Sequence, residues 1–293
     1  MFPAAFDYLP AHSVDEALAA LLKHGADARI LAGGQSLIPA MRFRLARPTV
    51  LVDINPIAGL AYLREENGAL LMGAGARDFA VEVAPFIKER YHLIFDAAAV
   101  VADPIVRQSG TIVGSLCHND PAGDWGVGAL AARAEVVVRG NAGTRVVPID
   151  DFLIDSFTTA VGEGEMALEA RFPTPNERTS GSYQKIERKV GDFATAAAGV
   201  QLTLSADGTI AAAGVAIGAA GPTAKRVVEA EKILLGARPS IAVLRAAAAE
   251  AKEISDPIAD TRGDIEFKRE MAGVLVYRGL LATLKRLQQG ELH

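Results

Sequence analysis

A proline-rich segment divides this chain into two stretches with different patterns. The segment Phe172-Pro173-Thr174-Pro175-Asn176-Glu177-Arg178 combines two prolines with turn-forming residues, which makes it the best candidate for a domain boundary. The chain has 293 residues, about twice the roughly 150 residues of a typical single domain. We therefore expect two domains, at residues 1–175 and 178–288.

The first domain is expected to consist of two subdomains, because its pattern changes near residue 57. Ser13 can cap a helix that ends before Gly25, and apolar residues recur on one face of this helix. Strands at 28–32 and 49–54 with a helix over 37–45 between them predict a parallel strand pair in the subdomain of residues 1–56. In the subdomain of residues 57–175, strand patterns occupy 69–73, 135–139 and 145–148, and helix patterns occupy 79–89 and 93–101.

The second domain has a hairpin followed by helices. Strand patterns over 196–205 and 210–218 flank the turn formers Asp207-Gly208. Helix patterns follow at 223–235, 240–254 and 264–288. The second domain is therefore predicted to be a small antiparallel sheet covered by helices, and the whole chain is predicted to be of the α+β class.

Composition excludes several kinds of partner and site. The net charge is −5 and no long block of Lys or Arg occurs, so the chain lacks the usual basis for binding nucleic acid. The single cysteine, Cys117, excludes an intrachain disulfide, an iron–sulfur cluster and a four-cysteine zinc site. No apolar run reaches the roughly 18 residues that indicate a membrane span, and the N-terminal residues lack a signal-peptide pattern. A cytoplasmic protein without a membrane span or a metal site is expected.

Two segments combine glycine with hydroxyl or amide side chains: 31–38, which follows a predicted strand, and 110–115, which we also expect to follow a strand. Such loops can expose consecutive backbone N–H groups to a phosphate, and two of them suit a pyrophosphate. Neither segment has the G-x-G-x-x-G pattern, and no phosphate-binding G-x-x-x-x-G-K-[ST] motif occurs. The alternative for each segment is an ordinary tight turn.

Single reactive side chains give weaker signals. His118 lacks a metal-binding spacing and is either a neighbour of a cofactor or a loop histidine that caps the backbone. Cys117 is expected to be a small buried residue, and Trp125 is expected in the core. Ser36 and Ser115 lie outside any G-x-S-x-G motif, so they are expected to be hydrogen-bond donors and not nucleophiles.

Taken together, the motifs are specific. The two glycine segments and Asp120-Pro121-Ala122-Gly123-Asp124 resemble the FAD-binding medium subunits of the molybdenum hydroxylase (xanthine oxidase) family. The similarity is greatest to the carbon monoxide dehydrogenase and the aldehyde or N-heterocycle dehydrogenase branch. Further motifs that match are Phe6-Asp7-Tyr8, the run from Tyr183 to Ala194, Arg262-Gly263 and Met271-Ala272-Gly273-Val274.

The resemblance implies a two-part FAD-binding domain of the vanillyl-alcohol-oxidase (PCMH) type and a C-terminal domain of the same flavoprotein family. It places the pyrophosphate and adenine side of FAD on Leu31, Ala32, Gly33, Gly34, Gln35, Ser36, Leu37, Ile38, Thr111, Ile112, Val113, Gly114 and Ser115. It also implies that Asp124 contacts the nucleotide portion, and that Val101, Met166 and Ala167 supply backbone or apolar contacts. Lys185 would approach the flavin and Phe193 would lie on the isoalloxazine ring. Lys185, Arg188 and Lys189 form a basic cluster that is equally typical of a solvated surface, and the resemblance favours Lys185 alone.

Three positions depart from the family pattern. Val113 replaces the first glycine of a Thr-Ile-Gly-Gly motif, so its φ must be negative if the segment binds FAD. Gln35 replaces a histidine that some relatives carry and cannot form a covalent bond to flavin, so noncovalent FAD is expected. Phe193 stands where close relatives can have tyrosine, which keeps the stacking ring and loses the hydroxyl.

The resemblance implies a subunit that transfers electrons and has no catalytic residue of its own. A large molybdopterin-binding subunit would oxidise the substrate, and a small subunit with two 2Fe–2S clusters would pass electrons to this chain's FAD and on to an external acceptor. A dimer of heterotrimers is expected. Two alternatives stay open: a stand-alone FAD-dependent oxidoreductase of the same fold, and an interaction subunit whose glycine segments are only turns. The substrate, whether carbon monoxide, an aldehyde, a purine or another N-heterocycle, and the electron acceptor stay open too.

Overall fold

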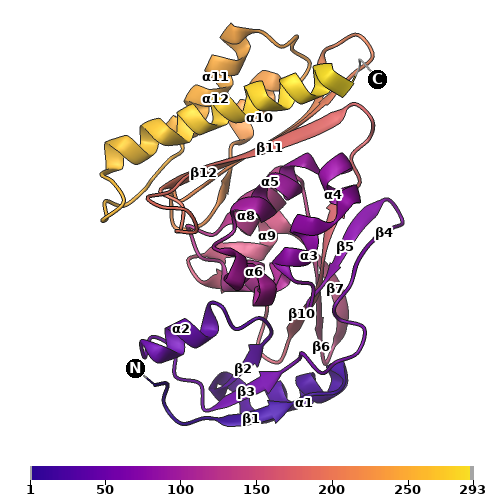
Figure 1. Ribbon diagram of the computed structural model, residues 1–293, viewed down its shortest axis with the longest axis vertical. Helices are drawn as coiled ribbons and strands as arrows, with labels where there is room; N and C mark the ends of the chain where they lie inside the picture. The colour runs from indigo at the N-terminus through magenta and orange to yellow at the C-terminus, as the bar shows by residue number, and fades with distance from the viewer. Residues whose placement is uncertain (1, 291–293) are drawn as a thin grey trace.

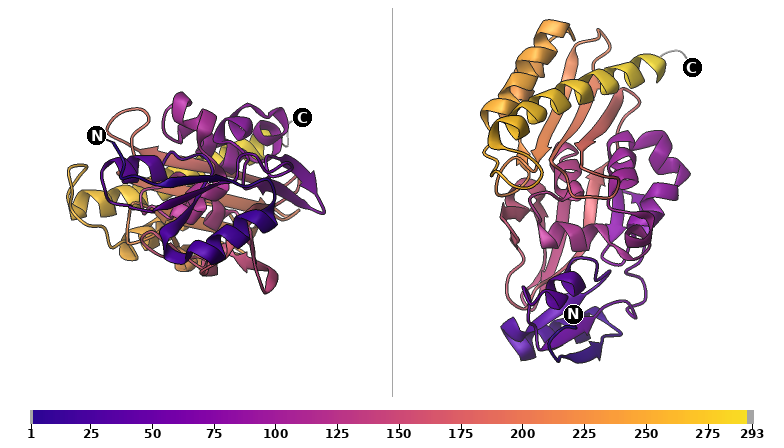
Figure 2. Two further views of the ribbon diagram at one scale, coloured as in Figure 1. Left: turned by 90° about the horizontal axis from the view of Figure 1, so that it is seen from below. Right: turned by 60° about the vertical axis from the view of Figure 1, so that its left-hand side comes forward.

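The computed structural model describes residues 2–290, and three regions follow one another along its longest axis (Figure 1). A small N-terminal region forms one end, a helix-rich region lies in the middle, and a sheet covered by helices forms the other end. The right-hand view in Figure 2 shows the same succession of regions. Within residues 2–290, none of the helices combines the length and the hydropathy that a transmembrane span needs.

The N-terminal region is a three-stranded parallel sheet in the order β1-β3-β2. Its helix α1 begins after Ser13, whose side chain accepts a hydrogen bond from the Glu16 N–H at 3.1 Å, and Gly25 ends the helix with a φ of +52°. The predicted parallel pairing of β2 with β3 is confirmed. Strand β1, near the start of the sequence, was not predicted. The elements are β1 (Asp7–Pro10), α1 (Val14–His24), the 3₁₀ turn η1 (Gly25–Asp27), β2 (Ala28–Leu31), α2 (Leu37–Arg42) and β3 (Val50–Asp53).

The middle region combines a five-stranded antiparallel sheet, in the order β4-β5-β10-β6-β7, with a group of short helices and a two-stranded ribbon. The strands are β4 (Leu63–Glu66), β5 (Ala69–Gly73), β6 (Glu135–Gly140), β7 (Gly143–Pro148), β8 (Leu153–Asp155), β9 (Thr158–Thr159) and β10 (Met166–Pro173). The helices are α3 (Asp78–Val83), α4 (Pro85–Arg90), α5 (His92–Val100), α6 (Pro104–Ser109), α7 (Ile112–His118), α8 (Asp124–Ala131) and α9 (Ile149–Phe152).

Two predicted helices of the first domain are shorter than expected. The helix expected at 79–89 is divided into α3 and α4, because Pro85 has no N–H and restricts Ala84, which adopts an extended conformation. The helix expected at 37–45 ends at Arg42, and Arg44 has a φ of +63° that interrupts the helical path. In both cases the apolar pattern continues past the point at which the backbone leaves the helix.

The C-terminal region is a four-stranded antiparallel sheet in the order β11-β12-β13-β14 with three helices. The hairpin around Asp207-Gly208 is confirmed, whereas residues 225–226 form a strand where the helix 223–235 was expected to begin. The elements are β11 (Thr179–Ile186), β12 (Ala196–Leu204), β13 (Ile210–Gly218), β14 (Lys225–Arg226), α10 (Val228–Leu234), α11 (Ile241–Glu253) and α12 (Ile265–Gly290). The α+β class and the helix-covered antiparallel sheet agree with the sequence prediction.

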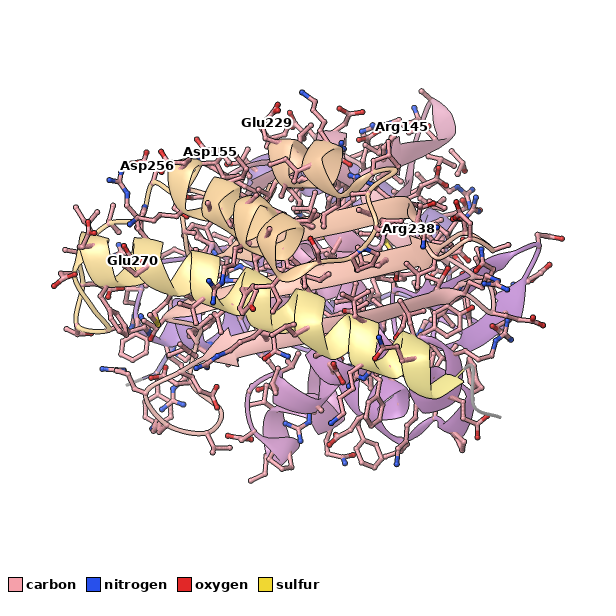
Figure 3. All side chains as sticks on the ribbon, turned by 90° about the horizontal axis from the view of Figure 1, so that it is seen from above. Arg145, Asp155, Glu229, Arg238, Asp256 and Glu270 are labelled. Carbon is pink, nitrogen blue, oxygen red and sulfur yellow. The ribbon has the colours of Figure 1, made fainter. Side chains whose placement is uncertain are left out.

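The C-terminal sheet is buried on both faces. Helices α10, α11 and α12 cover one face and form a core with the inward side chains of β12 and β13. Figure 3 shows α11 and α12 lying across the strands on this side. On the other face, Gly214 approaches α8 so closely that a Cβ atom would overlap the Ala131 carbonyl oxygen. The N-terminal and middle regions share one hydrophobic core, and residues of the C-terminal sheet such as Ala197 and Ala216 belong to it.

Candidate functional site

The segment 31–38 presents unpaired backbone N–H groups at the carboxyl end of β2. The N–H groups of residues 33–36 donate no hydrogen bond to any of the residues 2–290. Gly34 turns the chain here with a φ of +69°, which residues with a Cβ atom rarely adopt. The backbone N–H of Ile38 in α2 donates to the Gly34 carbonyl at 3.0 Å. A run of free N–H groups is suited to an anion such as a phosphate.

The segment 110–115 follows a helix, so the strand expected before it is wrong. Helix α6 ends at Ser109, and α7 begins at Ile112. Asp103 caps α6 with its side chain, and Pro104 occupies the first turn, where the missing N–H has no consequence. These capping residues are a helix signal that the sequence analysis missed.

Val113 satisfies the condition that its place in the motif imposes. It lies in α7, is 2% exposed and is not among the residues with a positive φ. Gly114 follows in the same helix, where a Cβ atom would lie 2.5 Å from the Thr111 hydroxyl oxygen. The valine is therefore accommodated without strain, whereas the following position requires glycine or a shift of Thr111.

The two glycine segments touch each other. Gly33 lies so close to Ser109 and Gly110 that a Cβ atom at Gly33 would overlap the Ser109 carbonyl oxygen. Two residues that the sequence analysis did not single out, Asn55 and Arg77, donate hydrogen bonds to the carbonyl groups that precede the glycines of the two segments, those of Ala32 and Ser109. The structure thus brings together segments that lie about seventy residues apart in the sequence.

A buried polar cluster joins α8 to β11. Asp124 accepts hydrogen bonds from the Tyr183 hydroxyl at 2.8 Å and from the Lys185 ammonium at 3.1 Å. Lys185 also donates to the Val100 carbonyl at 3.0 Å and lies 3.2 Å from the Glu187 carboxylate. The Lys185 side chain is only 2% exposed, so the surface alternative is wrong for it, although Arg188 and Lys189 are exposed.

Burial controls the charge state of this cluster. It raises the pKa of Asp124 to about 6, against the opposing effects of Lys185 and Tyr183, and it raises the pKa of the Tyr183 hydroxyl well above its usual value. A carboxylate that already accepts two hydrogen bonds retains unused lone pairs on both oxygens. Asp124 can therefore accept further hydrogen bonds from a ligand hydroxyl without losing its protein partners.

Val101 and Phe193 lie on neighbouring turns. Val101 follows α5, and its carbonyl accepts a hydrogen bond from the buried Arg107 at 2.9 Å. Gly191, with a φ of +84°, approaches the backbone of Ala102, the residue after Val101. Phe193, two residues beyond Gly191, is 49% exposed.

The Phe193 ring is partly open to solvent and lies beside Arg262. The guanidinium of Arg262 lies 5.9 Å from the Phe193 ring centroid and donates to Asp192 at 3.3 Å. The Nε atom of Arg262 is buried and has no hydrogen-bond partner among the described residues. An exposed ring beside an unsatisfied donor is what a planar polar ligand would cover.

Met166 and Ala167 belong to the protein interior. They begin β10, are 2% and 6% exposed, and pair with Arg139 and Val138 of β6. Helix α7 packs against β10, so these residues lie behind the second glycine segment. Their side chains serve the core.

Three other residues singled out in the sequence, Trp125, Cys117 and His118, lie outside the two glycine segments. Trp125 is fully buried and donates from its indole nitrogen to Asp78 at 2.9 Å, as expected for a core residue. Cys117 is half-buried against the hydrophobic core, and desolvation raises the pKa of its thiol to about 12. Burial lowers the pKa of His118, although Asp120 at 3.8 Å opposes this effect. Within residues 2–290, no group of three or more His, Cys, Asp or Glu side chains is arranged to hold a metal ion.

The sequence matches two families along almost its whole length. Residues 4–175 match the FAD binding domain in molybdopterin dehydrogenase, and residues 181–283 match the CO dehydrogenase flavoprotein C-terminal domain. The resemblance found in the sequence is thereby confirmed, and FAD is the cofactor of the domain that this chain contains.

Curated relatives and solved structures agree with these matches. The carbon monoxide dehydrogenase medium chain of Hydrogenophaga pseudoflava is 38% identical over 98% of this chain and 99% of its own length. The 6-hydroxypseudooxynicotine dehydrogenase complex subunit alpha of Paenarthrobacter nicotinovorans is 35% identical over 98% of this chain and 97% of its own length. A solved carbon monoxide dehydrogenase from Hydrogenophaga pseudoflava, with a TM-score of 0.95 and 39% identity, is matched over 98% of this chain and 99% of the solved chain. This chain therefore belongs to the FAD-binding medium subunits of the molybdenum hydroxylases, a family of dehydrogenases.

Proposed function

We propose that FAD extends from the two glycine segments to the turn that carries Phe193. The observation that supports this proposal is the direct contact of Gly33 with Ser109 and Gly110, beside the unpaired N–H groups of residues 33–36. A pyrophosphate carries two adjacent negative groups and needs several donors from more than one segment. Residues 31–38 and 111–115 would hold it, with Leu37, Ile38 and Ile112 anchoring the segments through their apolar side chains.

Around the rest of the cofactor, each residue would have a separate role. Asp124 would accept from hydroxyl groups of the nucleotide portion, and Val101 would contribute its backbone at the end of α5. Lys185 donates hydrogen bonds to Asp124 and to the Val100 carbonyl and forms an ion pair with Glu187, so we infer that it fixes Asp124 and the end of α5 and contributes positive charge near the flavin. Met166 and Ala167 would support α7 from behind.

Phe193 would cover one face of the isoalloxazine, and the buried Arg262 Nε would gain an acceptor when the site is filled. The isoalloxazine ring of bound FAD supplies the redox chemistry, because it can take up and release electrons one or two at a time. The chain's own residues bind and orient the cofactor and exclude water from it.

We further propose that this FAD receives electrons from the 2Fe–2S clusters of a small partner subunit and passes them to an external acceptor. Substrate oxidation would occur on a large molybdopterin-binding subunit, and the assembly would be a dimer of heterotrimers. The single cysteine supports this division, because the chain cannot ligate such clusters itself. The relatives' names include dehydrogenases of carbon monoxide, of caffeine and of 6-hydroxypseudooxynicotine, so the substrate is not inferred from this subunit. The cytoplasmic location remains a prediction.

Purification of the natural complex tests this proposal. The tagged chain should co-purify with two other subunits that carry molybdenum and iron, and its flavin should show absorbance bands near roughly 370 and 450 nm. Rapid mixing with the complex's substrate should reduce iron–sulfur and flavin absorbance in the intact complex and leave the isolated chain unchanged. Turnover of a substrate by the isolated chain would instead favour the stand-alone oxidoreductase, and a chain without flavin bands would contradict the proposed site.

A further inference from the structure

Asn55 and Arg77 form a hydrogen-bonded bridge between the two glycine segments. The side-chain amide of Asn55 donates to the Ala32 carbonyl at 2.9 Å, and Arg77 donates through Nη1 to the Ser109 carbonyl at 2.5 Å. Arg77 also donates through Nη2 to the Asn55 amide oxygen at 2.6 Å. A continuous chain of hydrogen bonds therefore runs from the residue before Gly33 to the residue before Gly110.

The bridge is anchored at both ends in regular structure. Asp53, the last residue of β3, is 6% exposed and accepts hydrogen bonds from the Asn55 backbone N–H at 3.0 Å and from its side-chain amide. The other carboxylate oxygen of Asp53 accepts from the Tyr8 hydroxyl of β1. At the opposite end, the N–H of Asp78, next to Arg77, donates to the Gly110 carbonyl at 3.0 Å. Both side chains of the bridge are thus held by neighbouring elements as well as by the glycine segments.

The bridge determines how the first segment presents its donors. A trans peptide unit is planar, so a carbonyl held on one side directs the following N–H to the other side. Because Asn55 holds the Ala32 carbonyl, the N–H of Gly33 points away from the bridge. The Ser109 carbonyl that Arg77 holds is also the surface on which Gly33 packs, so the same contact sets the separation of the two segments.

Arg77 also places a charge behind the segments. Both of its acceptors, the Ser109 carbonyl and the Asn55 amide, are neutral, and it forms no ion pair with a carboxylate of the described residues. A guanidinium that is not paired with an anion retains its attraction for a nearby phosphate. Geometry and charge at this position therefore favour the same ligand group.

We propose that Asn55 and Arg77 are positioning residues for the FAD pyrophosphate. They bind protein carbonyls and do not touch the cofactor, and they arrange the two segments before FAD arrives, which reduces the ordering cost of binding. This inference rests on the proposed placement of the pyrophosphate on these segments.

The test compares Arg77→Met and Asn55→Ala with a matched control, Arg145→Met. Arg145, which is labelled in Figure 3, lies on the edge strand β7 and donates to a backbone carbonyl, that of Ala160, at 2.6 Å. The three variants are purified in complex with their partner subunits, stripped of flavin and titrated with FAD. Loss of the bridge should raise the dissociation constant for FAD by about ten- to a hundredfold for either bridge variant, and the control should stay within about twofold of the natural protein.

Two further measurements separate positioning from general destabilisation. At saturating FAD, the ³¹P resonances of the pyrophosphate should shift in Arg77→Met and keep their natural positions in Arg145→Met. Arg77→Lys keeps the charge but cannot bind both acceptors in the planar geometry of arginine, so it should recover only a fraction of the lost affinity. If Arg77→Met does not fold, the exposed Asn55 still allows the test, because Asp53 keeps its hydrogen bonds from the backbone N–H of residue 55 and from the Tyr8 hydroxyl when the Asn55 side chain is removed.

Natural FAD affinity and natural ³¹P shifts in both bridge variants would overturn the proposal. Gly34→Val shows whether the proposed site itself is wrong. If Gly34→Val loses FAD while the bridge variants retain it, the segments bind the pyrophosphate and only the role of the bridge is wrong. If Gly34→Val also retains FAD, the placement of the pyrophosphate is wrong as well.

Discussion

The Lys185 ammonium lies 3.1 Å from a carboxylate oxygen of Asp124, and this buried ion pair connects β11 of the C-terminal sheet with α8 of the middle region. The two side chains are 2% and 8% exposed. Charges that are this well buried are stable only when they are paired and hydrogen-bonded. The pair therefore couples the folding of the C-terminal region to that of the middle region. Both of its residues also belong to the proposed flavin site.

Replacing Lys185 should destabilise the protein strongly. Lys185→Met leaves Asp124 and Glu187 without their cation, and breaking a buried pair in this way costs about 3–5 kcal/mol of unfolding free energy. Urea denaturation measures this change, with the exposed Lys189→Met as the control that should remain within about 0.5 kcal/mol. The double variant with Asp124→Asn should recover some of the loss. Equal stability of the two lysine variants would contradict the importance of the pair.

Asp78 should make stability depend on pH. Burial raises its pKa to about 7, against the hydrogen bond from Trp125 and the charge of Arg107. The folded protein thus holds a proton that the unfolded chain has released between about pH 4 and 7, so rising pH costs stability in this window. Relative to the natural protein, Asp78→Asn should gain about 1.4 kcal/mol of unfolding free energy per pH unit there. Parallel pH profiles for the two proteins would disprove this assignment, and the exposed Asp151→Asn serves as the control.

Valine at either Gly34 or Gly114 should abolish FAD binding without unfolding the C-terminal domain. Gly34 has a φ of +69°, which a β-branched residue does not adopt, and a Cβ at Gly114 meets the Thr111 hydroxyl. Flavin content and circular dichroism of the purified variants measure the two effects separately. Gly208→Val introduces the same strain at a φ of +81° in the hairpin turn and should keep its flavin. A full complement of FAD in both Gly34→Val and Gly114→Val would count against the two segments.

Phe193→Ala should weaken FAD binding by more than about tenfold, because a stacked ring contributes on the order of 0.5–1.5 kcal/mol beyond its buried area. Phe193→Tyr should keep nearly natural affinity. Flavin fluorescence titration and the flavin reduction potential are measured for both variants. Phe6→Ala removes a ring of similar exposure, 38% against 49%, and is the control. If Phe193→Ala keeps both the natural affinity and the natural potential, the ring is an ordinary surface residue.

The flavin should be FAD and should be noncovalent, because Gln35 has no nucleophilic ring nitrogen and because two segments in contact suit a pyrophosphate. Acid precipitation followed by chromatography of the supernatant should recover all of the flavin as FAD. Flavin that stays with the precipitated protein, or that elutes as FMN, is the contradictory result.

Local signals predicted the elements that end at strong boundaries. Ser13 and Gly25 bound α1 as expected, and the turn at Asp207-Gly208 separates β12 from β13. The region from α6 to α8 was missed, because its helices are six to eight residues long and the glycine and proline between them favour turns when they are read locally. Such short helices depend on tertiary packing for their stability.

The sequence predicts which segments form the candidate site, but it does not predict how these segments contact each other. Gly33, Gly34 and Gly114 carry a backbone requirement that is visible in the sequence. The bridge through Asn55 and Arg77 has no such signal, because its partners, Ala32 and Ser109, are bound through carbonyl groups that every residue possesses. The burial of Lys185 depends on Asp124, which lies far away in the sequence, and only the fold brings the two together.

The packing of Gly214 against Ala131 has a consequence for how such chains evolve. The boundary between the two family matches lies between residues 175 and 181. Across this boundary, α8 and β13 pack so closely that there is no room for a Cβ atom at Gly214. Recombination that joined the first half of one lineage to the second half of another would set a foreign helix against glycines selected for a different neighbour. Compatible halves must therefore be inherited together, and substitutions on one side of this seam should be accompanied by substitutions on the other.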